Sequence, residues 1–271
     1  MLDRGSVPHK QFINTNQRLE RAMNLKKFFT LMKKDIMTCF ANKSSLLMLV
    51  TPLCFCIFYS WIVEVRGNTS DMAKHFVLLI SCDFNLSIIP VSILPTLIAE
   101  EKEKGTMDAL YRAGVRNREF ICAKMAAVMT VLLGMALIMF VITKTNPAFL
   151  ALYLLLHILI TIVLLPIGLI VGVIARDQNG ANVYSTLPVV ILMACPVFTY
   201  ELGVLEHLSA FLPTNMLSEI LILYIEKSVL FSRAGLLSLV CCMVWGALGI
   251  YVFLRLYRKY GLGIGTKRIP R

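Results

Sequence analysis

The 271-residue sequence has few charged side chains: 16% of its residues are Asp, Glu, Lys or Arg, whereas 58% are hydrophobic. This balance excludes a water-soluble globular domain. The sequence also lacks a G-x-x-x-x-G-K-[ST] segment, so the chain has no evident loop with which to cradle ATP phosphates. Pairs of His or Cys at the usual zinc spacings are missing too, and neither a metal nor another cofactor is expected on this chain.

The cysteines and the positive net charge indicate neither a disulfide scaffold nor a nucleic-acid partner. Seven of the eight cysteines fall within apolar runs and Cys39 lies at the edge of one, so we interpret them as small core residues. The formal charge of +11 accompanies a hydrophobic body, whereas a nucleic-acid-binding protein needs a polar body with a basic face. No nucleic-acid partner is expected.

Six apolar stretches are long enough to cross a membrane as helices. A helix needs roughly 20 apolar residues to cross the hydrocarbon core, where it pairs all of its own backbone groups. We therefore predict an all-α membrane protein with a six-span domain over residues 44–257. The predicted spans are Ser44–Val65, Phe76–Ala99, Phe120–Ile142, Ala148–Ala175, Val183–Phe198 and Ala234–Tyr257.

The distribution of Lys and Arg predicts the orientation of these spans. Of the 27 Lys and Arg residues, 22 fall on the side that holds both termini and five on the opposite side. Because basic flanks stay in the cytoplasm, both termini are expected there, with the basic tail 258–271 near anionic lipid. We expect a multi-pass protein of a bacterial plasma membrane. No cleavable signal peptide is evident, and we assign no function to the polar extension 1–22.

Residues 23–43 are predicted to form an amphipathic helix that lies in the membrane interface. Apolar residues recur at helical spacing, and lysines occupy the other face. This helix either anchors the chain in the membrane only, or also touches a cytoplasmic partner with its basic face. The apolar residues are Leu25, Phe28, Phe29, Met32, Ile36 and Phe40, and the lysines are Lys26, Lys27, Lys33 and Lys34.

A short and highly charged segment, residues 100–118, connects the second and third spans. Glu100 and Lys104 stand one helical turn apart, so the second span is expected to continue into the cytosol as a solvated helix. Gly105 then suits a helix stop.

A second, shorter helix is predicted directly after this stop. Thr106 can cap a helix over about Met107 to Ala113, with Asp108 near its positive end and Arg112 near its negative end. Gly114 can close this helix. The alternative is that the segment is merely a solvated loop.

The charged segment resembles the first cytoplasmic loop of type-2 ABC exporter permeases. In that family an acidic and basic run ends in E-K-G-T, a short Leu-containing helix follows, and a basic residue enters the third span. The layout is similar as well, with an interfacial helix, six spans, cytoplasmic termini and a Pro-containing outer segment before the last span. The residues of this sequence that match the loop are Glu103, Lys104, Gly105, Thr106, Leu110 and Lys124.

The resemblance implies that the short helix is a coupling helix, which seats in a groove on a separate ATP-hydrolysing subunit. Two ATPase subunits, which carry ATP and Mg, would pair with two permease subunits, identical or related. The loop 176–182 is the natural second contact. The residues expected to couple this chain to the ATPase are Glu100, Glu101, Glu103, Lys104, Gly105, Thr106, Met107, Asp108, Leu110, Arg112, Arg176 and Asp177.

The outer segment 200–233 contains apolar runs that are too short to cross the membrane. Half-inserted helices are therefore predicted. By the resemblance, such helices would plug the outer end of a transport pathway, with Pro213, Thr214 and Glu219 in the gate. Packing against the outer ends of the spans is the alternative.

Three polar residues within the predicted spans, Asp83, Asn85 and His157, are candidates for that pathway. An ionised Asp at the bilayer centre costs about 2.5–3.5 kcal/mol on insertion scales, so such a group usually faces protein or water. The alternatives are that Asp83 is neutral or solvated from the outer side and that His157 makes an interhelical hydrogen bond. Gly168 and Gly172 predict a close helix contact.

These features together favour a transport subunit. We expect export of an amphipathic peptide or drug-like compound, powered by a separate ATPase; a polysaccharide or lipid-linked glycan is the second choice of substrate. Two functions of other classes stay open at this point. One is a membrane-embedded enzyme that modifies lipid with Asp83, Glu100 and Glu101, and the other is an immunity protein that captures a toxin without moving it.

Overall fold

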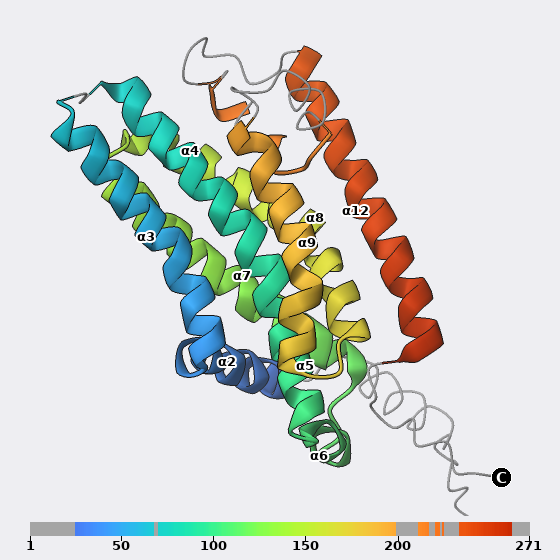
Figure 1. Ribbon diagram of the computed structural model, residues 1–271. Helices are drawn as coiled ribbons and strands as arrows, with labels where there is room; N and C mark the ends of the chain where they lie inside the picture. The colour runs from blue at the N-terminus through green and yellow to red at the C-terminus, as the bar shows by residue number, and fades with distance from the viewer. Residues whose placement is uncertain are drawn as a thin grey trace, which may run out of the picture.

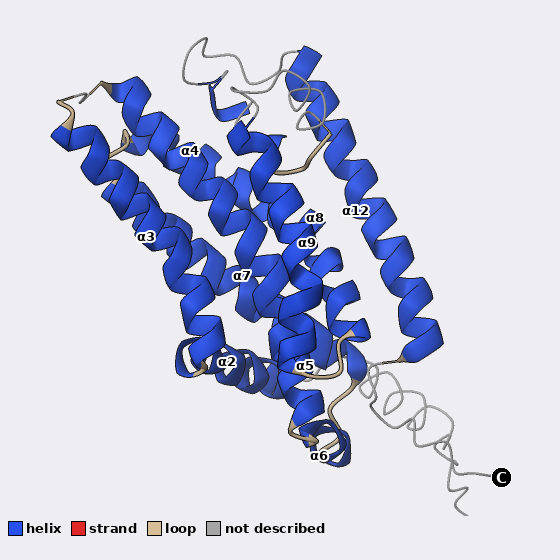
Figure 2. Ribbon diagram, viewed as in Figure 1, coloured by secondary structure: helices blue, strands red, loops and turns tan. Residues whose placement is uncertain are grey.

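The computed structural model describes residues 25–67, 70–198, 211–216, 220–222, 224 and 233–261, and over these residues it contains helices and their connections but no strand (Figure 2). This confirms the predicted all-α fold class. The helices, in chain order, are α2 (Leu25–Ala41), α3 (Lys43–Val65), α4 (Asp71–Ile88), the π-helix η1 (Ile89–Ile93), α5 (Leu94–Glu103), α6 (Thr106–Arg112), α7 (Asn117–Ile142), the 3-10 helix η2 (Pro147–Phe149), α8 (Leu150–Ile174), α9 (Gln178–Phe198) and α12 (Arg233–Tyr260).

Five helical stretches among the described residues are long and apolar enough to cross a membrane. Helix α9 takes the place of the predicted fifth span and packs against α4, α5 and η1, but it is not one of these five, so the count of six spans stays a prediction. The five stretches are Lys43–Val65, Asp71–Glu103, Asn117–Ile142, Pro147–Ile174 and Gly235–Tyr260.

The second stretch, Asp71–Glu103, is the centre of the bundle. In its most apolar window 89% of the residues are buried, against 17% for α3 and 22% for the stretch in α12. Two prolines, which can bend a helix, lie at its π-helical turn, Pro90 within η1 and Pro95 just after it. Pro95 has no N–H to offer the carbonyl of Val91, and the Ser185 hydroxyl of α9 donates to that carbonyl at 2.9 Å.

The predicted close contact at Gly168 and Gly172 is confirmed. A Cβ atom on Gly168 would lie 2.2 Å from the Pro90 carbonyl oxygen, and one on Gly172 would lie 2.7 Å from Cδ1 of Ile98. Only glycine therefore lets α8 approach the central helices this closely.

Two short helices lie at one end of the bundle, which we call the α6 end (Figure 1). Helix α2 crosses this end and packs mainly on α7, while α6 lies beyond the end of α5. Helices α3 and α12 stand at the two edges of the bundle in this view.

The cysteine prediction is correct for four residues and wrong for two. Cys39, Cys56, Cys82 and Cys242 are buried, Cys241 is half-buried, and the seven cysteines whose side chains are described are free thiols. The exposed pair, Cys54 and Cys122, lies on outward faces of α3 and α7, where a membrane helix accepts apolar side chains without a protein neighbour.

The predicted outer segment is described only in part. The Thr214 hydroxyl is fully buried and donates to the Leu192 carbonyl at 3.1 Å, and the Cys242 thiol donates to the Pro213 carbonyl at 3.7 Å. Residues 211–216 therefore tie α9 to α12. Glu219 lies outside the described residues, as do most of 200–233, residues 1–24 and the tail from 262 on. The predicted gate and its half-inserted helices stay predictions.

Candidate functional site

Helix α6 is held between two glycines with left-handed backbone conformation. Gly105 (φ 64°) ends α5 and Gly114 (φ 71°) ends α6, and both conformations are ones that residues with a Cβ rarely adopt. Just after α6, the backbone N–H of Gly114 donates to the Tyr111 carbonyl and that of Val115 donates to the Leu110 carbonyl. These two bonds satisfy carbonyls in the last turn of the helix. The predicted stop at Gly105 and closure at Gly114 are confirmed.

The predicted capping role of Thr106 is wrong. Gly105 occupies the N-cap position, and Thr106 is the first helical residue, one position later than a side-chain cap requires. Its hydroxyl donates instead to the carboxylate of Glu101 in the preceding turn. The helix accordingly spans Thr106–Arg112, close to the predicted Met107 to Ala113.

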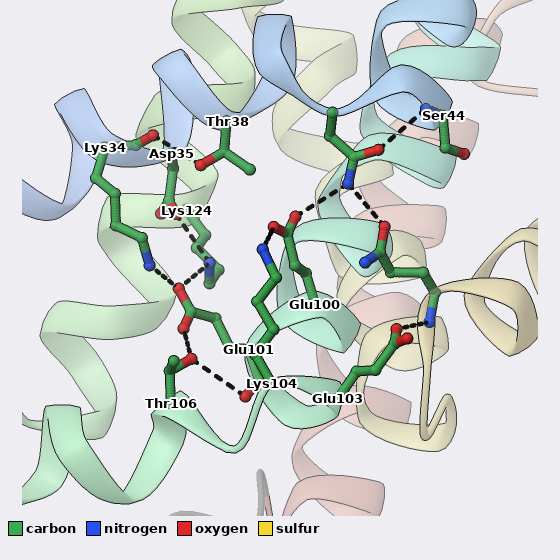
Figure 3. A network of polar contacts seen from close by, with 12 residues as sticks. Lys34, Asp35, Thr38, Ser44, Glu100, Glu101, Glu103, Lys104, Thr106 and Lys124 are labelled. Carbon is green, nitrogen blue, oxygen red and sulfur yellow. Dashed lines mark hydrogen bonds and ion pairs between the residues drawn. The ribbon is translucent and has the colours of Figure 1, made fainter.

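Glu101 is the hub of a buried ionic network at the α6 end (Figure 3). Only 5% of the residue is exposed, and its carboxylate is bound by the ammonium of Lys34 and the hydroxyl of Thr106. Lys124 Nζ lies 3.8 Å from Glu101 and 3.0 Å from Asp35. Four elements, α2, α5, α6 and α7, therefore meet in one set of ion pairs and hydrogen bonds.

The innermost pair of this network, Asp35 and Lys124, is almost completely removed from solvent. Asp35 is 2% exposed and Lys124 is 1% exposed. Burial raises the pKa of the Asp35 carboxyl above its ordinary value, and the ammonium groups of Lys124 and Lys34 oppose that shift. Burial also raises the pKa of the neighbouring Cys39 thiol to about 12, so this thiol stays protonated.

The other two acidic residues of α5 bind different neighbours. Glu100 receives hydrogen bonds from the Asn42 amide at 3.2 Å and from the Lys104 ammonium, whose pKa this contact raises. The predicted Glu100–Lys104 pair is thereby confirmed. Glu103 accepts a hydrogen bond from the backbone N–H of Gln178 at 3.1 Å. Its negative charge stabilises the positive N-terminal end of α9.

The turn that follows α8 completes this end of the molecule. The Asp177 carboxylate accepts from the N–H of Gly180 at 2.7 Å and caps α9, while the side chain of Arg176 is exposed. Asn42 also donates to the Gln178 side chain at 2.7 Å. The predicted second contact loop is therefore bound to α3 and α5 within this chain.

Lysines close the carbonyl ends of two helices here. Lys27 Nζ donates at 2.9 Å to the carbonyls of Ala113 and Gly114 at the end of α6. Lys102 Nζ donates to three carbonyls at the end of α8, Gly172, Val173 and Ala175, at 2.7–2.9 Å. A cation at the negative end of a helix is stabilising. These contacts attach the end of α6 to α2 and the end of α8 to α5.

The predicted faces of the interfacial helix α2 are only partly correct. Its buried residues are Leu31, Asp35 and Cys39, whereas Leu25, Phe29 and Phe40 of the expected apolar face are exposed. Two of its lysines, Lys27 and Lys34, contact the α5–α6 segment rather than an outside partner, while Lys26 and Lys33 are exposed; Phe28, Met32 and Ile36 pack against the core.

The sequence contained a signal for this inward ionic contact. Asp35 lies on the same helical face as Leu31 and Cys39, at intervals of four residues. A carboxylate between two apolar residues on one face requires a cation across the interface. Lys124 is the cation that pairs with Asp35, and in the sequence only the pattern of the permease loop singles it out.

The outer face of α6 is left accessible. Met107 is 5% exposed and Leu110 packs against the core, so these two residues hold the helix to the bundle. Asp108 and Arg112 are exposed, and Tyr111 is 60% exposed. An exposed aromatic ring between charged residues is typical of a protein-binding surface.

The structure does not place the pathway candidates at the α6 end. Asp83 and Asn85 lie in α4 and His157 in α8, all buried among helices of the chain. Asn85 donates to the Leu132 carbonyl at 3.3 Å, and His157 Nδ1 contacts the Tyr153 carbonyl at 2.9 Å. The predicted interhelical bond of His157 is wrong for this nitrogen, because Tyr153 is on the same helix. One oxygen each of Asp83 and Asn85 and Nε2 of His157 have no hydrogen-bond partner.

The arrangement at the α6 end serves attachment rather than chemistry. All three carboxylates of α5 are engaged by N–H or O–H donors of the chain: Glu101 binds Lys34 and Thr106, while Glu100 and Glu103 bind Asn42 and Gln178. Residues 76–255 match the model of a family described as ABC-2 family transporter protein. No curated protein matches the chain.

Proposed function

Because the chain belongs to the ABC-2 family of transporter proteins and is a membrane-spanning permease subunit, we propose that it exports its substrate with energy from ATP hydrolysed on separate subunits. Two ATPase subunits, which bind ATP and Mg, would pair with two permease subunits, identical or related. The α6 end would then lie in the cytoplasm. Family membership indicates a transport subunit rather than a lipid-modifying enzyme.

The observation that carries this proposal is the exposed outer face of α6 on a rigid support. Asp108, Tyr111 and Arg112 point away from the bundle's packed side, while the glycine turns at both ends of the helix fix its position. This is the geometry that a coupling helix requires, because a partner can seat on it without unfolding the segment.

The ionic network gives a route by which motion of α6 would reach the membrane. Glu101 connects α6 to α2 and α7, and Lys27 connects the far end of α6 to α2. Lys102 connects α5 to the end of α8. Since α5 continues through η1 into the central α4, a force on α6 would act on the most buried helix of the bundle. We infer that ATP-driven closure of the partner subunits reorients the spans by this route.

An amphipathic peptide or drug-like compound is the substrate class that we propose. Buried polar atoms without partners occur on α4 and α8 at Asp83, Asn85 and His157, within otherwise apolar helices. A transport pathway lined by these polar atoms and their apolar neighbours would offer both kinds of contact to an amphipathic substrate. Transport of a fluorescent cationic amphiphile into inverted vesicles, dependent on ATP and on the partner ATPase, would test this assignment.

The coupling role is tested on the exposed residues of α6. Charge reversal at Glu101 is unsuitable, because that carboxylate is buried and its loss would disturb the fold. Tyr111→Ala should lower stimulated ATPase activity and co-purification of the partner by about tenfold or more, as expected for an aromatic at the centre of an interface. Tyr111→Phe keeps the ring and is the matched control, so it should retain most of the coupling. Unchanged coupling in Tyr111→Ala and Arg112→Glu would refute this role for α6.

A further inference from the structure

Two hollows are lined by residues of α8, α9 and α12, and α12 packs directly on α8. The first has a volume of about 320 Å³ and is lined only by apolar residues, among them Leu187 of α9 and Leu248 of α12. The second has a volume of about 780 Å³ and lies at the α6 end, where Arg176, Tyr184 and Tyr260 are part of its wall.

The two hollows follow one another along the same three helices. On α9, Leu187 lines the first hollow and Tyr184, one turn away, lines the second. On α12, Val252 and Leu256 are related in the same way, by four residues. Ile170 and Ile174 of α8 repeat the relation. We call this feature the α9–α12 groove; in Figure 1 α12 stands at the edge of the bundle beside it.

The apolar part of the groove is open to the membrane. Leu248 belongs to the membrane-length stretch Gly235–Tyr260 and is 55% exposed, and Leu187 of α9, which lines the same hollow, is 68% exposed. Hydrocarbon is the solvent at this depth, so the natural occupant of such a hollow is an apolar chain.

The chemistry changes at the α6 end of the groove. The exposed Arg176 guanidinium supplies a planar set of donors that suits a phosphate, and Tyr184 and Tyr260 are exposed aromatics of the kind that line membrane interfaces. The Lys102 ammonium adds positive charge while it holds the carbonyls at the end of α8. Asp177 is the acidic residue in this wall, and it is engaged in capping α9.

We propose that the α9–α12 groove binds an anionic phospholipid from the leaflet at the α6 end. One acyl chain lies in the apolar hollow, and the phosphate contacts Arg176 in the polar one. The order of the two hollows along the helices matches the order of chain and headgroup in a lipid, and the positive charge matches the phosphate. This inference goes beyond the export function and does not depend on it.

Native mass spectrometry of the full chain with added lipid tests this site. Phosphatidylglycerol should bind more tightly than phosphatidylcholine. Arg176→Gln should weaken phosphatidylglycerol binding about fivefold, the factor that one basic residue near an anionic surface is worth. The matched control Lys43→Gln removes one exposed charge from the start of α3 and should leave this site unchanged.

A second pair of variants tests the apolar part of the groove. Leu248→Trp fills the hollow and should reduce bound lipid about tenfold, because several buried methylene contacts are lost. Leu254→Trp adds the same ring six positions further along α12, on the opposite face, and should bind lipid normally. Equal binding of the two lipids, or equal loss in Arg176→Gln and Lys43→Gln, would overturn the proposal. So would a Leu248→Trp variant that loses a dimer of this chain while it keeps its lipid.

Discussion

At the α6 end, the stability of the chain depends on single residues of the Asp35–Lys124 pair. Both charges are more than nine-tenths buried and lie 3.0 Å apart. Removal of one partner of such a pair costs about 3–5 kcal/mol, and here Lys124 would keep only the longer contact to Glu101 at 3.8 Å. Asp35→Asn should therefore lower the free energy of unfolding of the detergent-purified chain by about 3 kcal/mol, measured by denaturant titration.

The double variant Asp35→Asn/Lys124→Met is the control for this prediction. It removes both charges, and pairs replaced by apolar residues are often neutral in stability. Most of the lost stability should therefore return. Glu101 keeps its contacts to Lys34 and Thr106 in that variant. A double variant that is less stable than Asp35→Asn would show that the pair is not the reason for the loss.

At the scale of elements, the attachment of α6 to α2 depends on Lys27. Its ammonium contacts two carbonyls at the end of α6. Such a contact at a helix C-terminus stabilises by about 0.3–1 kcal/mol, so Lys27→Ala should speed amide exchange in residues 106–114 by about two- to fivefold. Hydrogen exchange with mass spectrometry measures this directly. Lys26→Ala, an exposed neighbour, should leave the exchange of α6 at its wild-type rate.

The contact of α8 with the central helices depends on a missing side chain. Gly168→Ala would place a Cβ 2.2 Å from the Pro90 carbonyl, so the helices must separate, at a cost of about 1–3 kcal/mol. Gly134→Ala on α7 meets nothing within 4 Å and should be neutral or stabilise by up to about 1 kcal/mol. Thermal unfolding measures the stability of both variants. Equal losses of stability would contradict the close contact at Gly168.

Sequence reasoning predicted elements better than it predicted the direction of side chains. Apolar length and the glycines at 105 and 114 identified the long helices and α6, because these signals are local in the chain. The acidic residues of α5 were expected to face a partner, but Glu101 is turned inward by Lys34 and Lys124, which are 67 and 23 positions away. Periodicity within one helix does not show which lysine of another helix lies opposite.

At the scale of the whole molecule, the two ends of the bundle differ in how their basic residues are placed. At the end away from α6, Lys144 pairs with Glu64 at 2.7 Å and Lys74 pairs with Asp71 at 3.0 Å, and Arg66 is the exposed basic residue at the end of α3. The α6 end presents exposed basic side chains at Lys26, Lys33, Arg112, Arg116 and Arg118. This asymmetry supports a cytoplasmic α6 end, since positive charge is retained there.

Cysteine labelling in intact cells tests this orientation. In a chain whose native cysteines are replaced by Ser, Lys144→Cys should react with a membrane-impermeant maleimide added outside, because that residue is exposed at the far end. Arg112→Cys, which is also exposed, lies on α6 and should react only after the membrane is opened. Thermal unfolding of the purified variants confirms that each one is folded. The reverse pattern would place α6 outside the cell, where no ATP-hydrolysing subunit could reach it, and the coupling role of α6 would then have to be abandoned.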